Sequence, residues 1–408
     1  MTGDAPALSP EFALLAACAL RDDAGLGDVA ETLVQRPGFD WDRFVHEADF
    51  HGVEQVSLAR LEHALPGVFP ATHAAELRHQ RLQEAALYAT QARATARLVE
   101  ALAHEGIPAL VLKGAAQAAQ LYHPTPEVRG SSDIDLLIPA EHLQRSDDVL
   151  QRAGMAREWP AADPPAAARP MFMRLANVFD YRGPVSGELV ELHFRATLNP
   201  HALPATFEEL WAGSEPVDTG HGTVRALGGP LQTFYLCHHV LCQLPYRLKW
   251  FGDVARALRR AGAAGCAAHV ASYPRPLPLR SARLTDEVLD WLGDAVERTA
   301  ARTSGGVPAS ADVARIARSM VELRGHSTKR TLARLPLELN HLLFVLRQLS
   351  GWRSRAYELL LALSDPRDAV SLQLGPRFAI IYALLGPVLA LGRFLKRQRA
   401  QGSPAQQR

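Results

Sequence analysis

The chain carries almost no net charge and few cysteines. Its 44 Lys and Arg residues are balanced by 43 Asp and Glu residues, which gives a formal charge of +1. A balanced chain has no broad electrostatic field for a polyanion, which argues against a dedicated nucleic-acid binder. The four cysteines lack the spacing of metal ligands and stand at positions 18, 237, 242 and 266. We therefore expect buried free thiols and a reducing, cytoplasmic environment.

The sequence also lacks an export signal and a long hydrophobic run. Its first residues, MTGDAPALSPEF, carry no positive charge, so we expect no signal peptide. The longest apolar run, residues 378–392, is broken by Gly386 and Pro387. It is shorter than the ~20 residues that cross a bilayer, so we expect no transmembrane segment. A helix packed into the core is the favoured interpretation of this run, although its basic flanks leave a membrane-surface helix open.

Lysine is scarce, with four among the 44 basic residues, and one of the four, Lys113, stands at a turn. The apolar run 107–112 before it is typical of a buried strand, and residues 115–122 after Gly114 are typical of a helix. A strand, a glycine turn and a helix start direct free backbone N–H groups toward an anion such as phosphate. The alternative is an ordinary helix start with a surface lysine.

Two aspartates alternate with apolar residues in the stretch 132–138, SDIDLLI. In a strand, Asp133 and Asp135 point to one face and the apolar residues between them to the other. Two carboxylates ~7 Å apart on one face repel each other unless a cation lies between them. Mg²⁺ fits such a place, because it binds one or two carboxylates together with substrate phosphates. Taken alone, the pattern is also common on exposed strands.

The combination is more specific than its parts. KGAA, a helix ending in LYHP, Arg129 and then SSDIDLLI resemble the nucleotidyltransferase superfamily with the DNA polymerase beta-like fold. More closely, they resemble the bacterial family usually labelled "uncharacterised nucleotidyltransferase". The resemblance implies a third carboxylate on a later strand. The stretch 187–195, GELVELHFR, supplies Glu191, with His193 on the same strand face.

The resemblance implies the following roles at the phosphate and metal side. Asp133, Asp135 and Glu191 would hold Mg²⁺ or Mn²⁺, and Lys113 with the Gly114 turn would bind the triphosphate. Many relatives in the wider superfamily have a serine after the glycine, whereas alanine follows here. We expect either that Ser131 or Ser132 takes the place of that serine or that Lys113 suffices. Arg129 is expected either to bind phosphate or to form a structural ion pair with Glu127 or Asp133.

A second stretch, residues 237–258 (CHHVLCQLPYRLKWFGDVARAL), resembles another motif of the family. The family histidine falls on His239, and a second one falls on Gln243, which is a departure. Arg247, Lys249 and Asp253 are expected either to face the carboxylates and reach the substrates, or to form a solvated helix face beside a core tryptophan.

The predicted fold class is α+β, with a small mixed sheet of nucleotidyltransferase type and flanking helices in a largely helical chain. We expect a helical region at 1–83, the nucleotidyltransferase core at 84–200, a second helical region at 201–400 and a disordered tail at 401–408. Within the core we expect strands at 172–182 and 188–194 and a loop at 159–170, either a flap or disordered. A continuous helix is expected at 285–321.

The expected function is metal-dependent transfer of a nucleoside monophosphate from a triphosphate to a hydroxyl-type acceptor on a small molecule, peptide or protein. Two alternatives stay open. One is a non-catalytic nucleotide-binding or scaffold protein that keeps the fold. The other is a toxin-type nucleotidyltransferase that acts on RNA, which the near-neutral charge disfavours.

Overall fold

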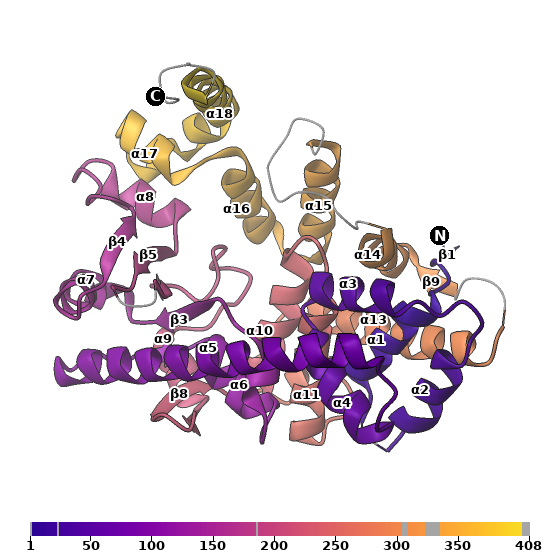
Figure 1. Ribbon diagram of the computed structural model, residues 1–408. Helices are drawn as coiled ribbons and strands as arrows, with labels where there is room; N and C mark the ends of the chain where they lie inside the picture. The colour runs from indigo at the N-terminus through magenta and orange to yellow at the C-terminus, as the bar shows by residue number, and fades with distance from the viewer. Residues whose placement is uncertain (1, 23, 185–186, 304–307, 323–334, 402–408) are drawn as a thin grey trace.

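A mixed sheet supports the acidic residues. The computed structural model describes residues 2–22, 24–184, 187–303, 308–322 and 335–401 (Figure 1). Seven of its strands form one sheet in the order β4-β5-β6-β3-β2-β8-β7. Their bounds are β2 Leu110–Val111, β3 Asp133–Leu137, β4 Ala156–Trp159, β5 Val178–Arg182, β6 Leu189–His193, β7 Ser214–Asp218 and β8 Thr223–Leu227. β3 is parallel to β6 and β2 to β8, and the other neighbours are antiparallel. The predicted α+β class with a mixed sheet is confirmed.

Helices surround this sheet. The first are α1 Pro10–Leu20, α2 Leu26–Val34, α3 Trp41–His51, α4 Glu54–Ala64, α5 Ala71–His104, α6 Gly114–Leu121, α7 Leu143–Arg152, α8 Arg169–Leu175 and α9 Phe207–Ala212. Those that follow are α10 Gly229–Cys242, α11 Leu248–Ala261, α12 Cys266–Ala271, α13 Arg280–Ala300, α14 Ala311–Glu322, α15 Leu335–Gln348, α16 Trp352–Leu363, α17 Pro366–Leu372 and α18 Ala379–Gln401. Short 3₁₀ turns lie at η1 Pro126–Arg129, η2 Ala140–His142 and η4 Pro376–Phe378, and β1 Thr2–Asp4 pairs with β9 Pro308–Ser310.

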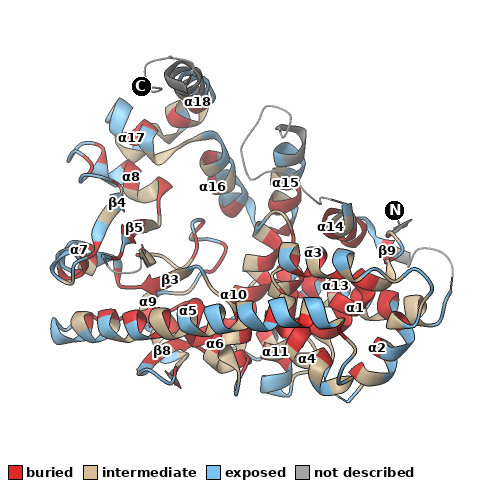
Figure 2. Cartoon of the chain, viewed as in Figure 1, coloured by how far each residue is buried: buried red, intermediate tan, exposed pale blue. Residues whose placement is uncertain are grey.

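The two faces of the sheet differ. On one face, apolar strand residues such as Ile134, Leu136 and Val190 share a core with residues of α5 and α7. On the other, strand residues from β2, β3 and β8 share a core with α10 and α11. The helix α5 runs along the sheet and on to the N-terminal helices (Figure 1). Its inward side is buried and its outward side exposed (Figure 2).

The helix α1 lies at the centre of a second core. Residues 11 to 19 are all buried, because this helix is apolar on nearly every side. It packs against α2, α3, α11 and α13. This core joins residues of the first 77 positions to residues between 240 and 349, so segments far apart in sequence are packed together.

Several local predictions were wrong. The expected strand at 172–182 begins as the helix α8, whose first turn holds Pro170, and only β5 is extended. The expected helix at 285–321 is two helices, α13 and α14. The strand β7 was not predicted. The loop at 159–170 is short and described throughout, and Asp163 is anchored by Arg157 at 2.8 Å.

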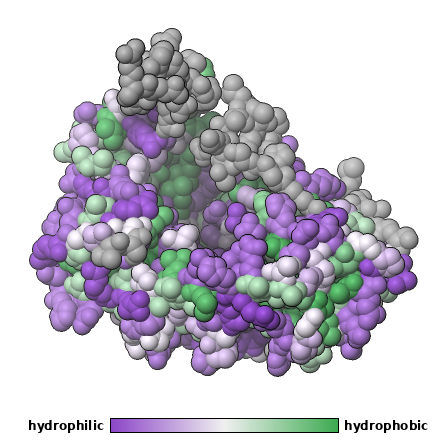
Figure 3. All heavy atoms as spheres, viewed as in Figure 1, coloured by the Kyte–Doolittle hydropathy of each residue, from purple (hydrophilic) through white to green (hydrophobic). Residues whose placement is uncertain are grey.

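The C-terminal helices α15 to α18 lie at the top of the molecule in Figure 1. Below α16, between β5 and α15, the surface is hollowed, with apolar side chains deep inside it (Figure 3). The apolar run 378–392 was expected to be a helix packed in the core. That prediction was wrong, because only 11% of the stretch Pro376–Arg393 is buried. The tail predicted to be disordered lies, beyond Gln401, outside the described residues.

Candidate functional site

The register of β3 against β6 brings the acidic residues together. Asp135 lies directly beside Glu191, and the next pair along this face joins Leu137 with His193. Because paired residues of parallel strands point to the same face, Asp133, Asp135 and Glu191 share one face. The apolar residues between them point to the opposite face and into the core. The alternation read from the sequence is therefore present in both strands.

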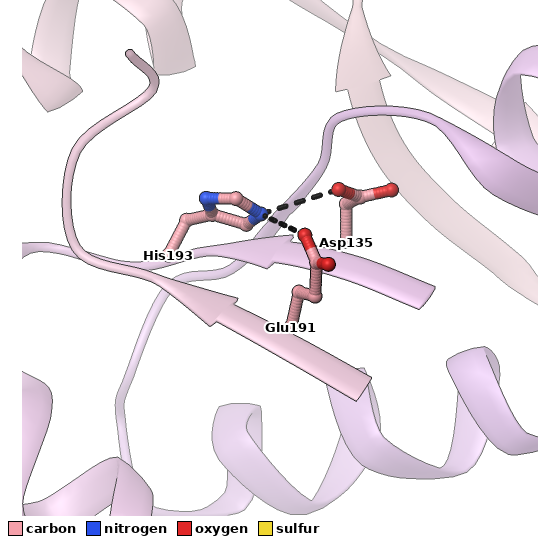
Figure 4. A group of neighbouring side chains, drawn as sticks. All are labelled: Asp135, Glu191 and His193. Atoms are coloured by element: carbon pink, nitrogen blue, oxygen red, sulfur yellow. Dashed lines mark hydrogen bonds and ion pairs between the residues drawn. The ribbon is translucent and has the colours of Figure 1, made fainter. Parts of the chain in front are cut away.

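Three side chains converge on this face: Asp135, Glu191 and His193. Their ligand atoms all lie within 4.8 Å of one another. The Nε2 atom of His193 is 3.2 Å from both Asp135 Oδ1 and Glu191 Oε2, and the three side chains point toward one another from adjacent strands (Figure 4). Burial alone would lower the pKa of His193, but its hydrogen bonds to the two carboxylates outweigh burial and raise that pKa.

The group has the properties of a cation site. Asp135 is fully buried, and its Oδ2 atom has no hydrogen-bond partner among the described residues. A buried carboxylate oxygen without a donor is costly, and a bound cation would remove that cost. Two carboxylates suit Mg²⁺ or Mn²⁺, and the imidazole of His193 is a ligand that transition metals accept more readily than Mg²⁺.

Lys113 reaches into the same group. Its Nζ lies 3.0 Å from Asp135 Oδ1. Burial would lower the pKa of Lys113, but the Asp135 carboxylate outweighs burial and raises it. In return, although burial would raise the pKa of Asp135, the Lys113 ammonium and the His193 hydrogen bond lower it. Both groups are therefore charged at neutral pH.

The turn after Lys113 requires a glycine. Gly114 has a φ of +66°, and a Cβ at this position would lie 3.1 Å from the backbone oxygen of Asp133. This close approach sets the N-terminus of α6 against the start of β3. The Lys113–Gly114 turn and the acidic strand, which the sequence placed on separate elements, are thus direct neighbours.

Asp133 lies beside the converging group and is not part of it. Ser131 donates a hydrogen bond from Oγ to Asp133 Oδ1 at 3.4 Å, while Ser132 is exposed. Burial, followed by repulsion from Asp135, raises the pKa of Asp133. The three acids predicted from the sequence share a face, but His193 takes the third place in the tight cluster.

Arg129 is buried in an ion pair with Asp253. Its Nε and Nη2 atoms donate to the two carboxylate oxygens at 3.0 and 2.9 Å, and the Tyr122 hydroxyl donates to the same carboxylate at 2.8 Å. The expected structural partners of Arg129, Glu127 and Asp133, are therefore wrong. Asp253 was expected either to face the carboxylates or to lie on a solvated helix face, and instead it is buried and paired with Arg129.

The other residues of the second motif have separate surroundings. Lys249 donates to the backbone oxygen of Gly130 at 2.7 Å, and burial, followed by repulsion from Arg129, lowers the pKa of Lys249 to about 8. The guanidinium of Arg247 lies over the ring of Phe50, 5.7 Å from its centre. Its contact is thus with α3, whereas the sequence had left open a place opposite the carboxylates or on a solvated helix face.

His239 lies near the acidic face. Its ring stacks on Tyr235 with centres 6.3 Å apart and meets Trp250 edge-on. Burial, followed by the charge of Lys113, lowers the pKa of His239 to about 3, so this imidazole is neutral. Burial also raises the pKa of Tyr235, whose hydroxyl interacts electrostatically with Lys113 and Asp135.

Two residues near the site were missed from the sequence. Tyr235 lies on a largely apolar helix, and no pattern in that helix distinguishes it. Asp180 lies on β5 directly opposite Glu191. Burial and the Glu191 carboxylate raise the pKa of Asp180. The alternation of Asp180 with Phe179 and Tyr181 could have revealed it, had β5 been separated from the helix before it.

One comparison with known proteins found a match. A family model described as "Uncharacterised nucleotidyltransferase" matches residues 37–282, which is more than half of the chain and includes all of the site residues above. No curated protein and no solved structure matches the chain. Because the family model matches the residues of both the seven-stranded sheet and the second motif, the chain belongs to the family of uncharacterised nucleotidyltransferases.

Proposed function

We propose that the chain transfers a nucleoside monophosphate from a nucleoside triphosphate to a hydroxyl-type acceptor, with Mg²⁺ or Mn²⁺ at Asp135 and Glu191. The observation that carries the proposal is the converging group of Asp135, Glu191 and His193, in which one buried carboxylate oxygen has no partner in the described part of the chain. When bound, such a cation neutralises phosphate charge and lowers the pKa of an attacking hydroxyl. Asp133 contributes a further carboxylate at the edge of the group.

Lys113 and the start of α6 form the phosphate side. Lys113 supplies a charged ammonium beside Asp135, and α6 supplies free backbone N–H groups at its first turn. Both would bind the negative oxygens of the triphosphate and orient its α-phosphorus toward the acidic face. Ser131 reaches the same turn and is the better substitute for the family serine, because Ser132 points into solvent.

The chemical step forms one bond and breaks one. The acceptor oxygen attacks the α-phosphorus, the bond from that phosphorus to the bridging oxygen breaks, and pyrophosphate leaves. Glu191, whose side chain is 29% exposed, is the carboxylate best placed to take the acceptor proton. His193 donates to Glu191 and Asp135 and orients both. Arg129 acts indirectly, because its ion pair with Asp253 fixes the turn that leads to β3.

The test is release of pyrophosphate by purified protein with each triphosphate in turn and a cell extract as the source of acceptor. We expect a metal-dependent product that chelator abolishes and that the Asp133→Ala, Asp135→Asn double variant does not form. A product that persists in the double variant or in chelator would exclude this mechanism.

Folding of each variant must be checked by circular dichroism. Repulsion among the carboxylates alone would make Asp135→Asn nearly neutral for stability, but the structure shows a compensating contact. Asp135 is buried and paired with Lys113, so its loss leaves a poorly solvated ammonium and costs roughly 2–4 kcal/mol.

A further inference from the structure

One side of α18 is attached to the rest of the protein. Tyr382 is fully buried, and its hydroxyl is hydrogen-bonded to the backbone N–H and the backbone oxygen of Leu374, at 2.9 and 2.7 Å. Gly386 passes so close to the backbone oxygen of Leu363 that a Cβ would overlap it. Arg393 pairs with Asp368. Residues 382, 386 and 393 recur at helical spacing, so these attachments lie on one side of the helix.

The opposite side of α18 is apolar and exposed. Ile380, Leu384, Val388 and Leu391 are 68, 69, 66 and 53% exposed. Their spacing of four, four and three residues aligns them in a stripe along the helix. Only 11% of the stretch Pro376–Arg393 is buried. A continuous apolar stripe in water is costly, and such surfaces mark contacts with a partner or with a membrane.

The sequence of this C-terminal segment is rich in basic residues. From residue 376 to residue 408 the sequence has no Asp or Glu, and it has six basic residues, at positions 377, 393, 396, 397, 399 and 408. The chain as a whole is balanced, so basic charge is concentrated at this end. Arg393 is neutralised by its ion pair with Asp368, and the other five basic residues give this segment an excess of positive charge. An apolar stripe in a segment with excess basic charge is the pattern of a helix that lies in the interface of an anionic membrane.

We propose that α18 docks on the surface of an anionic lipid bilayer, with the stripe from Ile380 to Leu391 in the boundary between headgroups and acyl chains. By length and composition the 18 residues of Pro376–Arg393, with a mean hydropathy of 1.2, would also pass for a membrane span. The attachments at Tyr382, Gly386 and Arg393 argue for a helix lying on the surface, because they hold its other side against protein. The proposal does not depend on the chemistry proposed above.

The test is flotation of the full chain with vesicles of phosphatidylcholine, alone or mixed with phosphatidylglycerol. We expect binding to the mixed vesicles that weakens as salt is added. The Ile380→Ser, Leu384→Ser, Val388→Ser triple variant should bind roughly tenfold more weakly or worse. Leu82→Ser is the matched control, because Leu82 is 72% exposed on α5, away from the stripe, and should bind as the wild type does.

A second variant tests the charge separately. Arg377→Glu leaves the stripe intact and should weaken binding to the mixed vesicles several-fold without promoting binding to phosphatidylcholine. It also keeps the test informative if the triple variant does not fold. The proposal fails if the wild type binds neither vesicle, or if the stripe and charge variants that fold bind like the wild type. It also fails if the wild type is a dimer that the triple variant converts to monomer, because a second copy then covers the stripe.

Discussion

Four acids lie on one face of the sheet, and single residues among them have different roles. Glu191 is in the converging group, whereas Asp180, directly opposite it on β5, is not. We expect Glu191→Gln to lower kcat by about a thousandfold, roughly 4 kcal/mol of barrier, while Asp180→Asn changes it less than about tenfold. Pyrophosphate release under saturating metal compares the two. Equal losses would mean that Asp180 shares the ligand role.

The pH dependence of stability has a source outside the cluster. Burial raises the pKa of Glu54, at the start of α4, from its ordinary 4.5 to about 7, and its Oε2 has no hydrogen-bond partner among the described residues. Between these two values the folded state binds more protons than the unfolded state, so stability falls as pH rises to about 7 and stays lower above it.

Replacing Glu54 by an uncharged residue should abolish this fall in stability with rising pH. We expect Glu54→Gln to stabilise the protein by about 1–2 kcal/mol at pH 8 and to have no effect near pH 4, where Glu54 is neutral in both states. Urea denaturation at both pH values measures the difference. Glu76→Gln, an exposed site on α5, is the control. A gain in stability of the same size at both pH values would show that ionisation of Glu54 is not the cause.

The sequence indicated which residues share a strand face, but it did not indicate which residues on different strands contact one another. Alternation placed Asp133 and Asp135 on one face, and it did the same for Glu191 and His193. Which residue of β6 lies beside Asp135 depends on the register of two strands more than 50 residues apart, and no local pattern encodes that register. For the same reason the sequence could not show that Lys113 contacts Asp135.

At the scale of elements, an ion pair between residues distant in sequence fixes the position of Arg129, which local patterns did not predict. Arg129 is the last residue of η1 and Asp253 lies on α11, and their ion pair links these elements although the two residues are 124 positions apart. Local errors had a different origin. Residues 172–175 are as apolar as the strand that follows them, and apolar content alone does not separate a short helix from a strand.

The link between η1 and α11 should contribute strongly to stability. Asp253→Asn leaves the buried guanidinium of Arg129 without its counter-charge, and we expect it to cost ~3–5 kcal/mol. Tyr122→Phe removes a single hydrogen bond to the same carboxylate and should cost about 1 kcal/mol. Urea denaturation of the two variants compares their free energies of unfolding. If Asp253→Asn costs no more than Tyr122→Phe, the ion pair is not a stabilising link.

At the scale of the whole molecule, the sheet and the helical cores are built from segments distant in sequence. The core around α1 contains residues from the N-terminal helices and residues as far along the chain as Leu349, and the helices α10 and α11 contribute to the core beneath β2 and β8. The predicted boundaries at 83 and 200 stay predictions. Composition and periodicity identified most of the helices, but they carry no information on which distant helices share a core.

Because the site lies between α6, β3, β6 and α10, its ligands should stabilise the folded chain as a whole. A ligand at a hundred times its Kd adds about 2.7 kcal/mol of stability. For a chain of this size we expect that to raise Tm by roughly 3–6 °C when a non-hydrolysable triphosphate and Mg²⁺ are added together. Each alone should shift it less, because the carboxylates repel the triphosphate without the cation.

Glu191→Gln is the suitable control for this melt, because Glu191 is partly exposed and its loss leaves the Lys113–Asp135 pair intact. We expect this variant to melt at nearly the wild-type temperature without ligand and to lose most of the shift with metal and triphosphate. A shift of equal size in chelator would show that the triphosphate binds without the cation. A shift retained in the variant would show that Glu191 does not hold the cation, and the proposed metal site would then have to be assigned to Asp133 and Asp135 alone.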